Sequence, residues 1–559
     1  MESPWTAASA PNEQAALDFE AAPLFDLLDQ SARRCPTRTA LVFRNYRLTY
    51  ARLKDLAEAM AFNLRREGLV PGERVALMLP NCPQMVLSYW AVLKAGGVVV
   101  MTNPLYMETE LTHQLNDSGA RFLITLDLTW PKIEKLLGRI GVDKVFVSRM
   151  SDGLRFPLNL LYDYKARREG QARVVPFDQR TVLPFAPLLR GRNRYSHQEI
   201  NPRKDPALLQ YTGGTTGLPK GCVLTHFNLS ANAQQCRKVL DTLAKDREIF
   251  LGVLPYFHIY GLTVCLNLPT LLGATLAPIP RFVPRDLLEV AARAKPTVFP
   301  GAPSVYLAML QQKDIGRFDL SSIRFCVSGS APMPVEQLRR FEQATGGLIL
   351  EGYGLSEASP VTHINPPRGP RKVGSIGPVL PGTEARIVDP DHGLTDMPQG
   401  QVGELILRGP QVMRGYYHRP EDTAEVLRDG WLFTGDLARQ DEDEYFFIVD
   451  RKKDLVISGG YNIYPREIDE VLHAHPKIRE AVTVGLPHPA RGEAIKAYVV
   501  LNEGESMTKS EVMGWCRERL ASYKIPREVE FRAELPKTAV GKVLRRVLRD
   551  EELARSRKD

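Results

Sequence analysis

Short apolar segments with the length of buried strands alternate with longer helical segments through most of this chain. A strand at 74–80, a helix at 83–96 and a strand at 97–104 begin the pattern, and it returns between 296 and 354. When helices join successive strands, the sheet is largely parallel and the helices cover its faces. The alternation therefore predicts an α/β fold with layered, mostly parallel sheets.

Two changes in this pattern divide the chain. Residues 384–409 consist of short strands and turns, which predicts a small antiparallel unit. Beyond residue 453 the sequence has a helix–strand alternation of its own, and 559 residues exceed one ordinary domain. We expect a flexible leader at 1–25, a large N-terminal domain at 26–452 and a small α+β C-terminal domain at 453–559.

The composition, with 44% hydrophobic and 25% charged residues, is typical of a globular enzyme. The net charge is +8, much of it in residues 537–559, which suits anionic partners such as nucleotides, coenzymes or an acidic membrane surface. No basic patch interleaved with aromatic residues is present, so a nucleic-acid partner is not expected. The seven cysteines form no C-x-x-C pair and no secretory signal is visible, which favours a cytoplasmic protein.

Residues 249–280 contain no Asp, Glu, Lys or Arg. This stretch is longer than the roughly 20 residues of a membrane span. Prolines and glycines interrupt it, however, so we expect a strand at 249–255, a helix at 262–273 and a strand at 274–280. Core packing and the lining of an apolar pocket are both consistent with this segment. A membrane transporter is the competing interpretation.

The segment "YTGGTTGLPKG" at 211–221 holds four glycines, three threonines and one lysine. Such a loop turns backbone N–H groups, hydroxyls and a positive charge toward phosphate oxygens. Leu218 and Pro219 separate Gly217 from Lys220, so the P-loop pattern of kinases and GTPases fails. A buried strand precedes the loop and a capped helix is expected after it. That order would place phosphate beside the positive end of a helix.

Four further segments accompany this loop: "EGYGLSE" at 351–357, "GWLFTGDLA" at 430–438, "DRKKDLVISGGYNIYPREIDE" at 450–470 and "LPKTAVGKVLRR" at 535–546. In this order and spacing the chain closely resembles the adenylate-forming family, which includes acyl-CoA synthetases, peptide-synthetase adenylation domains and beetle luciferases. The resemblance covers nearly the whole chain. Within the family, the chain looks most like bacterial long-chain fatty acid–CoA ligases.

The resemblance implies ATP, Mg²⁺, coenzyme A, a mobile C-terminal domain and two chemical steps. A carboxylate first attacks the α-phosphate of ATP, which gives acyl-AMP and pyrophosphate. The thiol of coenzyme A then takes the acyl group and AMP leaves. Both reactants of the first step are anions, so cations and N–H donors must offset their repulsion.

The family's motifs assign nucleotide-binding roles to matching positions. The phosphate loop would comprise Thr212, Gly213, Gly214, Thr215, Thr216, Gly217 and Lys220. Glu357 matches the Mg²⁺-binding glutamate, which Thr215 would assist, and Ser356 would lie near the α-phosphate. The adenine pocket would contain Tyr353, stacked on the base, with Ser330, Ala331, Glu351, Gly352 and Gly354. Asp436 would accept both ribose hydroxyls and Arg451 would reach the ribose from the other side. Taken singly, each of these residues has an ordinary structural explanation.

The C-terminal segment would supply Lys542, which matches the lysine between the α-phosphate and the substrate carboxylate. Gly541 would tighten the loop that carries it. Lys453 occupies the hinge position, about which the small domain would rotate after pyrophosphate leaves. Gly459 and Gly460 would then leave a passage for the pantetheine arm. Ile457 and Ser458 replace a lysine found near this position in luciferases and 4-coumarate–CoA ligases, which weakens a luciferase interpretation.

The acyl group is expected beside His258, with Tyr260, Leu262 and Val264 lining its pocket. A core histidine is an equally good explanation of His258. No charged side chain stands in this run to meet an amino group, so an apolar tail is favoured over an amino acid. Each buried CH₂ contributes about 0.8 kcal/mol, and the resemblance favours long chains. Medium-chain and aryl acids stay open.

Lys542, Glu357, Lys220 and His258 are thus the expected catalytic residues of a long-chain fatty acid–CoA ligase. Alternatives are an adenylating enzyme that loads a carrier protein and an inactive nucleotide-binding regulator. Hydrolase motifs such as G-x-S-x-G and H-E-x-x-H are absent. The expected location is the cytoplasm. Peripheral contact with the inner face of the membrane and a homodimer are further alternatives.

Overall fold

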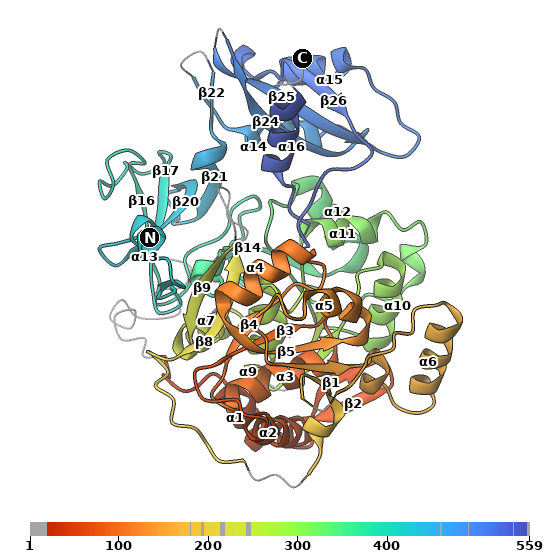
Figure 1. Cartoon of the computed structure of the whole chain (residues 1–559). Helices are drawn as coiled ribbons and strands as arrows, with labels where there is room; N and C mark the ends of the chain where they lie inside the picture. The colour runs from red at the N-terminus through yellow and green to blue at the C-terminus, as the bar shows by residue number, and fades with distance from the viewer. Residues whose placement is uncertain are drawn as a thin grey trace.

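A computed structural model describes residues 19–178, 180–191, 195–212, 219–241, 247–458, 461–489, 491–539 and 541–555. Within these residues the strands form two large mixed sheets and two smaller ones. Figure 1 shows the helices packed around the large sheets, while the last sheet lies apart at the top of the view. The predicted α/β class, with layered sheets followed by a small C-terminal unit, is confirmed.

The first large sheet has the strand order β15-β14-β13-β12-β10-β11-β1-β2. Strands β1, β11, β10, β12, β13 and β14 run parallel to one another. The two edge strands, β2 and β15, are antiparallel to their neighbours. The strands are β1 (Thr39–Phe43), β2 (Tyr46–Thr49), β10 (Ile249–Gly252), β11 (Thr275–Pro278), β12 (Val298–Gly301), β13 (Phe325–Ser328), β14 (Leu348–Gly354) and β15 (Val361–Ile364).

The second large sheet has the order β18-β9-β8-β4-β3-β5-β6-β7. It is parallel from β7 to β8, and β9 and β18 add an antiparallel edge. The strands are β3 (Arg74–Met78), β4 (Val98–Met101), β5 (Ala120–Leu126), β6 (Lys144–Ser148), β7 (Val182–Pro184), β8 (Pro206–Thr212), β9 (Lys220–Thr225) and β18 (Gly415–Tyr416).

Helix α3 (Pro83–Lys94) lies entirely in the core, because it is apolar on nearly every side. Its Tyr89 hydroxyl donates to Asn267 Oδ1 at 3.0 Å. The other helices of the N-terminal region are α1 (Asp26–Arg34), α2 (Tyr50–Arg66), α4 (Glu108–Ser118), α5 (Trp130–Leu136), α6 (Leu158–Arg168), α7 (His226–Val239), α8 (Ile259–Leu262), α9 (Leu268–Leu272), α10 (Pro284–Ala294), α11 (Pro303–Leu310), α12 (Val335–Thr345) and α13 (Pro420–Val426).

The predicted antiparallel unit is the sheet β16-β17-β20-β19, with β21 paired to β20. Its strands are β16 (Glu384–Val388), β17 (Gly403–Arg408), β19 (Leu427–Arg428), β20 (Trp431–Gln440) and β21 (Phe446–Arg451). The short 3-10 helix η8 (Lys452–Asp454) leads from β21 into the last sheet. The predicted domain boundary at Lys453 falls in this connection and stays a prediction.

The last sheet has the order β23-β22-β25-β24, with β26 paired to β25, and an apolar core of its own. Its elements are β22 (Val456–Ser458), β23 (Tyr461–Ile463), α14 (Pro465–His473), β24 (Ile478–His488), β25 (Gly492–Leu501), α15 (Lys509–Arg517), β26 (Glu528–Phe531) and α16 (Arg545–Arg555).

The capped helix predicted after the glycine-rich loop is confirmed as α7, but it does not follow the loop directly as expected. Strand β9 follows the loop and pairs antiparallel with β8, so that Thr212 lies opposite Lys220. Helix α7 begins only after Thr225, whose hydroxyl accepts the Asn228 N–H at 3.1 Å. About 17 Å of extended chain therefore separates Lys220 from the start of α7. The described residues on either side of the phosphate loop are thus two antiparallel strands, and no helix begins directly after it.

The uncharged segment 249–280 folds as the predicted broken elements. Between β10 and β11 lie α8, a π-helical turn (Thr263–Asn267) and α9, and Gly273 ends α9 in the left-handed conformation. Among the described residues, no helix has the length and apolar character that crossing a membrane requires.

The predicted leader at 1–25 is too long at its C-terminal end. Phe19 is buried against Phe227 and Ala231, and the Leu24 N–H donates to His226 Nδ1 at 3.0 Å. Residues 19–25 therefore belong to the folded domain, because their apolar side chains have a helix to pack on.

Candidate active site

A cavity of about 3760 Å³ runs between the large sheets and the C-terminal segment. The predicted site residues that line it are Thr212, Lys220, His258, Tyr260, Val264, Ser330, Ala331, Glu351, Gly352, Tyr353, Gly354, Ser356, Glu357, Asp436, Arg451, Lys453 and Lys542. Leu262 is fully buried in the core and does not line the cavity. Gly213, Gly214, Thr215, Thr216, Gly217, Gly459 and Gly460 lie outside the described residues.

Asp436 is fixed by two neighbouring elements. It lies opposite Arg451 in the β20–β21 pair, and Arg451 Nε is 3.4 Å from Asp436 Oδ1. The Tyr353 hydroxyl donates to Asp436 Oδ2. Burial, followed by the charge of Asp436, raises the pKa of Tyr353 well above its usual range, so the phenol keeps its proton. The residues that the resemblance places at adenine and at ribose are thus linked to each other.

The carboxyl ends of β13 and β14 form one wall of the cavity, as the ligand edge of an open parallel sheet does. Ser330 has a φ of +71°, and a Cβ on Gly354 would lie 2.2 Å from the Pro360 carbonyl oxygen. Only glycine fits at Gly354. Glu351 accepts the Gly374 N–H at 2.8 Å, and burial raises the pKa of its carboxyl to about 7. Close contacts of the backbone, at Gly354 and at Gly374, therefore shape this wall.

Two side chains that the sequence did not single out hold the phosphate side of the cavity. Lys220 forms an ion pair with Asp422 of α13, and its ammonium lies 5.4 Å from the centre of the Tyr416 ring. The Tyr416 hydroxyl donates to Glu357 Oε1 at 2.7 Å. Tyr416 reaches this place because β18 pairs with β9 next to Lys220. The pairing joins segments about 200 residues apart, so no local signal in the sequence marks it.

Among the described residues of the cavity, Glu357 is the carboxylate that the resemblance assigns to Mg²⁺. Among the described residues, no group of three or more His, Cys, Asp or Glu side chains could hold a metal ion. Glu357 lies at the cavity beside the flank of the phosphate loop, so its oxygen would be joined by phosphate oxygens of a nucleotide. Mg²⁺ prefers such sites, with few protein ligands and several phosphate or water oxygens.

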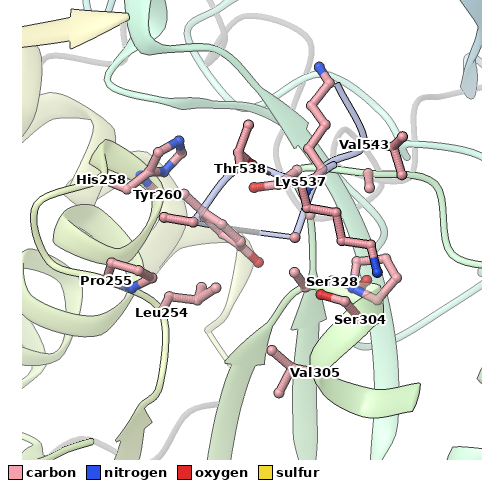
Figure 2. A pocket seen from close by; sticks show the side chains of 18 of the residues that line it. Leu254, Pro255, His258, Tyr260, Ser304, Val305, Ser328, Lys537, Thr538 and Val543 are labelled. Carbon is pink, nitrogen blue, oxygen red and sulfur yellow. Dashed lines mark hydrogen bonds between the residues drawn. The ribbon is translucent and has the colours of Figure 1, made fainter. Parts of the chain in front are cut away.

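Lys542 enters the cavity on a tight turn. The Thr538 N–H donates to the Lys542 carbonyl oxygen at 2.8 Å, and the Lys542 N–H donates to Thr538 Oγ1 at 3.1 Å. Gly541 has a φ of +81°, as its predicted role requires. A Cβ on Gly541 would lie 2.1 Å from Ser304 Oγ of α11, so the turn touches the N-terminal region. Figure 2 shows Thr538 and Val543 of this segment in one pocket with Ser304, His258 and Tyr260, and Thr538 is drawn beside Tyr260.

Basic side chains crowd together at this turn. Burial, followed by repulsion from Arg451, lowers the pKa of Lys542 to about 7, although Asp436 and Asp454 act in the opposite direction. Burial and Arg451 likewise lower the pKa of Lys453 to about 8. An anionic ligand bound among Lys542, Arg451 and Lys453 would favour the charged form of these lysines. The arrangement is therefore suited to bind an anion.

The acyl side of the cavity begins at His258. Burial, followed by the charge of Lys542, lowers the pKa of His258 to about 4, so the imidazole is neutral at neutral pH. Its Nδ1 accepts the Tyr260 N–H at 3.3 Å, and the Tyr260 hydroxyl donates to the Val327 carbonyl oxygen at 2.8 Å. Beyond them the lining is apolar, with Val264, Leu268, Phe250 and Ile279. These four described side chains offer an apolar wall to a hydrocarbon.

Comparisons with known proteins show which family the chain resembles. The sequence model of the AMP-binding enzyme family matches residues 28–417, and that of the AMP-binding enzyme C-terminal domain matches residues 467–542. The long-chain-fatty-acid–CoA ligase of Bacillus subtilis is 47% identical over 532 residues, which is 95% of this chain and 94% of that protein.

Two crystal structures of MatB from Rhodopseudomonas palustris are each 30% identical in sequence to this chain, but they superpose on it to different degrees. The ATP-bound structure gives a TM-score of 0.83 and the apo structure gives 0.73, although both cover 95% of this chain and 99% of that one. This chain therefore superposes better on the ATP-bound structure than on the apo structure.

The contact of Gly541 with Ser304 predicts how the turn can be dislodged. In Gly541→Ala, the new methyl group clashes with Ser304, so the turn moves out and trypsin cuts at Lys542 at least about tenfold faster. Gly504 has nearly the same φ, +80°, and no atom within 4 Å of a built Cβ. Gly504→Ala is the matched control and leaves the rate of cleavage unchanged.

A second substitution separates the clash from backbone strain. Ser304→Gly in the Gly541→Ala background removes the obstructing hydroxyl and restores most of the protection. Equal cleavage of Gly541→Ala and the unmodified protein would mean that the turn does not rest on α11.

Proposed function

This chain belongs to the AMP-binding enzyme family, and on that premise we propose that it joins a long-chain fatty acid to coenzyme A. It is an AMP-forming acid–CoA ligase that uses ATP and Mg²⁺, with coenzyme A as the second substrate. One observation carries the assignment of the chemistry to this cavity. Lys542 lies within electrostatic reach of Asp436 and Arg451 on the nucleotide side and of His258 at the start of the apolar lining.

In the first step the acid and the triphosphate repel each other. The ammonium of Lys542 supplies a positive charge between the two groups of residues that would hold them, in a half-buried place where electrostatic interactions are strong. Lys220 and the N–H groups of the phosphate loop serve the leaving pyrophosphate. Magnesium, when bound at Glu357 and the phosphates, supplies further positive charge.

His258 has a positioning role in this proposal. Its imidazole is neutral and one ring nitrogen is already an acceptor for the Tyr260 N–H, so Nε2–H is free to donate toward the acid. A charged imidazolium is not needed, because Lys542 supplies the charge. Tyr260 and Val264 then guide the chain of the acid, while Leu262 supports this wall from the core.

The second step needs Lys542 to withdraw. Rotation about Lys453 in η8 would remove the turn 538–542 and bring the loop that contains Gly459 and Gly460 to the cavity. The closer match to an ATP-bound than to an apo neighbour supports the assignment of the present arrangement to the first step. The division into a domain at 26–452 and a mobile domain at 453–559 belongs to this proposal, with the start moved to include residues 19–25.

The choice of acid rests on the apolar wall and on the relatives. A long aliphatic chain gains the most from this lining, at about 0.8 kcal/mol per CH₂. A medium-chain or aryl acid and a carrier protein as acceptor are the alternatives. The cytoplasmic location, a homodimer and peripheral contact with a membrane stay predictions.

The length dependence of the reaction tests the proposed substrate. With ATP and Mg²⁺, pyrophosphate release is expected to increase several-fold in kcat/KM for each pair of methylenes from short to long acids, until the cavity is filled. Coenzyme A and a holo-carrier protein are compared as acceptors for each acid. Preference for short or aryl acids, or for the carrier, would overturn the choice of substrate.

The lowered pKa of Lys542 predicts a dependence on pH. Because the charged form is lost as pH rises through about 7, kcat/KM for ATP in pyrophosphate release falls up to tenfold per pH unit above that value. In Lys542→Arg the charge persists, so the fall disappears even if the rate is lower. An identical descending limb in Lys542→Arg would assign the titration to another group.

A further inference from the structure

The side chain of Tyr416 lies between two residues that are expected to serve the phosphates of ATP. Its hydroxyl donates to Glu357 Oε1 at 2.7 Å, and the centre of its ring is 5.4 Å from the Lys220 ammonium. Lys220 in turn forms an ion pair with Asp422 of α13. Lys220, Tyr416 and Glu357 all line the reaction cavity. One segment, from β18 to α13, therefore contacts both phosphate-binding residues.

Glu357 is held by its backbone as well as by its side chain. The Met413 N–H donates to the Glu357 carbonyl oxygen at 2.8 Å. Nearby, the Ser359 hydroxyl donates to the Gln411 carbonyl oxygen at 2.8 Å, so the segment before β18 is fixed to the turn that carries Glu357. The bond from Tyr416 occupies one carboxylate oxygen and leaves Oε2 for a cation. Hydrogen bonds that orient a metal-binding carboxylate typically contribute about 10–100-fold to metal affinity.

The position of Asp422 is set by the contact between β18 and α13. The Tyr416 N–H donates to Thr423 Oγ1 at 2.9 Å. A Cβ on Gly415, whose φ is +145°, would lie 2.7 Å from Thr423 Cγ2, so the approach is as close as glycine allows. Helix α13 thus packs directly on the strand that carries Tyr416. Asp422, in the first turn of α13, is brought to Lys220 by this packing.

The ion pair of Lys220 and Asp422 is suited to exchange. The two side chains are 26% and 27% exposed, and an ion pair that water reaches contributes little to stability. Lysine carries its charge at the end of a flexible stem, so its ammonium can move between two anions while the backbone stays in place. A triphosphate carries more negative charge than one carboxylate. It can therefore take Lys220 away from Asp422.

We propose that Tyr416 and Asp422 are positioning residues for the triphosphate of ATP. Tyr416 fixes the Glu357 carboxylate for the divalent cation, and Asp422 holds Lys220 at the cavity until a phosphate replaces it. In the nucleotide-free protein, Asp422 is thus a substitute for phosphate. The inference rests on the proposed function, because it takes ATP as the ligand and Lys220 as a residue that serves its phosphates.

Equilibrium binding of ATP tests the role of Asp422 without an acid or coenzyme A. In calorimetric titrations, Asp422→Asn is expected to lower the Kd for ATP about two- to fivefold, with and without Mg²⁺, because no ion pair has to break. Glu421→Gln removes a charge from the same turn of α13 and is the matched control with an unchanged Kd. A merely structural role of Asp422 would leave the affinity for ATP unchanged or weaken it, and either result would overturn the exchange.

The role of Tyr416 is tested by the dependence of binding on Mg²⁺. Tyr416→Phe removes the hydroxyl and keeps the ring beside Lys220. The Kd for ATP with Mg²⁺ is expected to rise about tenfold, whereas the Kd for ATP with EDTA stays unchanged, because no cation then engages Glu357. Tyr417→Phe, at the next residue, is the matched control; the Tyr417 ring lies against His418, with ring centres 4.0 Å apart. Equal losses with Mg²⁺ and with EDTA, or no loss in either, would refute this role.

A double-mutant cycle shows whether Tyr416 acts through Glu357. In a Glu357→Gln background, Tyr416→Phe is expected to cause no further loss of affinity for ATP with Mg²⁺, since the carboxylate that it orients is already gone. Additive losses would mean that Tyr416 acts on the nucleotide by itself, which would contradict a positioning role.

The same titrations separate this inference from the proposed function. If the unmodified protein binds ATP with Mg²⁺ and both variants behave like their controls, the positioning roles are refuted and the proposed function is unaffected. If the variants behave as expected but no fatty acid is turned over, the choice of substrate is refuted and the positioning roles stand. An unmodified protein that binds no ATP would refute both.

Discussion

The positive charge of Lys542, held against Arg451 and Lys453, is the interaction on which the rest of the site depends. Burial, followed by repulsion from Arg451, lowers the pKa of Lys542 to about 7, so the charged form is only marginally favoured at neutral pH. An anion bound there would remove this penalty. The turn that carries Lys542 packs against α11, where Gly541 lies close to Ser304. Binding of anionic substrates and seating of the C-terminal segment are therefore coupled.

The fold places the reacting groups by strand order more than by local loops. The ends of β13 and β14 shape one wall, and the β20–β21 pair puts Asp436 opposite Arg451. Strand β21 leads directly into η8, where Lys453 is two residues from Arg451. A rotation at this connection would thus move Lys453 and Lys542 relative to Asp436 and Arg451, the residues expected at the ribose. A nucleotide that binds both sides can favour one domain arrangement over the other.

The sequence predicted the layered α/β fold because strands buried on both faces are continuous apolar runs between amphipathic helices. The described residues that it singled out line one cavity, apart from Leu262, while their roles stay predictions. It missed strand β9, "KGCVLT", between the glycine-rich loop and the correctly predicted helix α7, because so short an apolar run is an ambiguous signal. Tyr416 and Asp422 were not found, because a long-range strand pair brings them to Glu357 and Lys220.

The two half-reactions of Lys542→Ala test the central claim most directly. The account predicts that pyrophosphate release from ATP and a long-chain acid falls about 10²–10³-fold, because the charge between the two anions is gone. Thioester formation from supplied acyl-AMP and coenzyme A stays within about threefold, since Lys542 has withdrawn in that step. An equal loss in both half-reactions would contradict the account, because Lys542 would then act in both steps and not only in the closed arrangement.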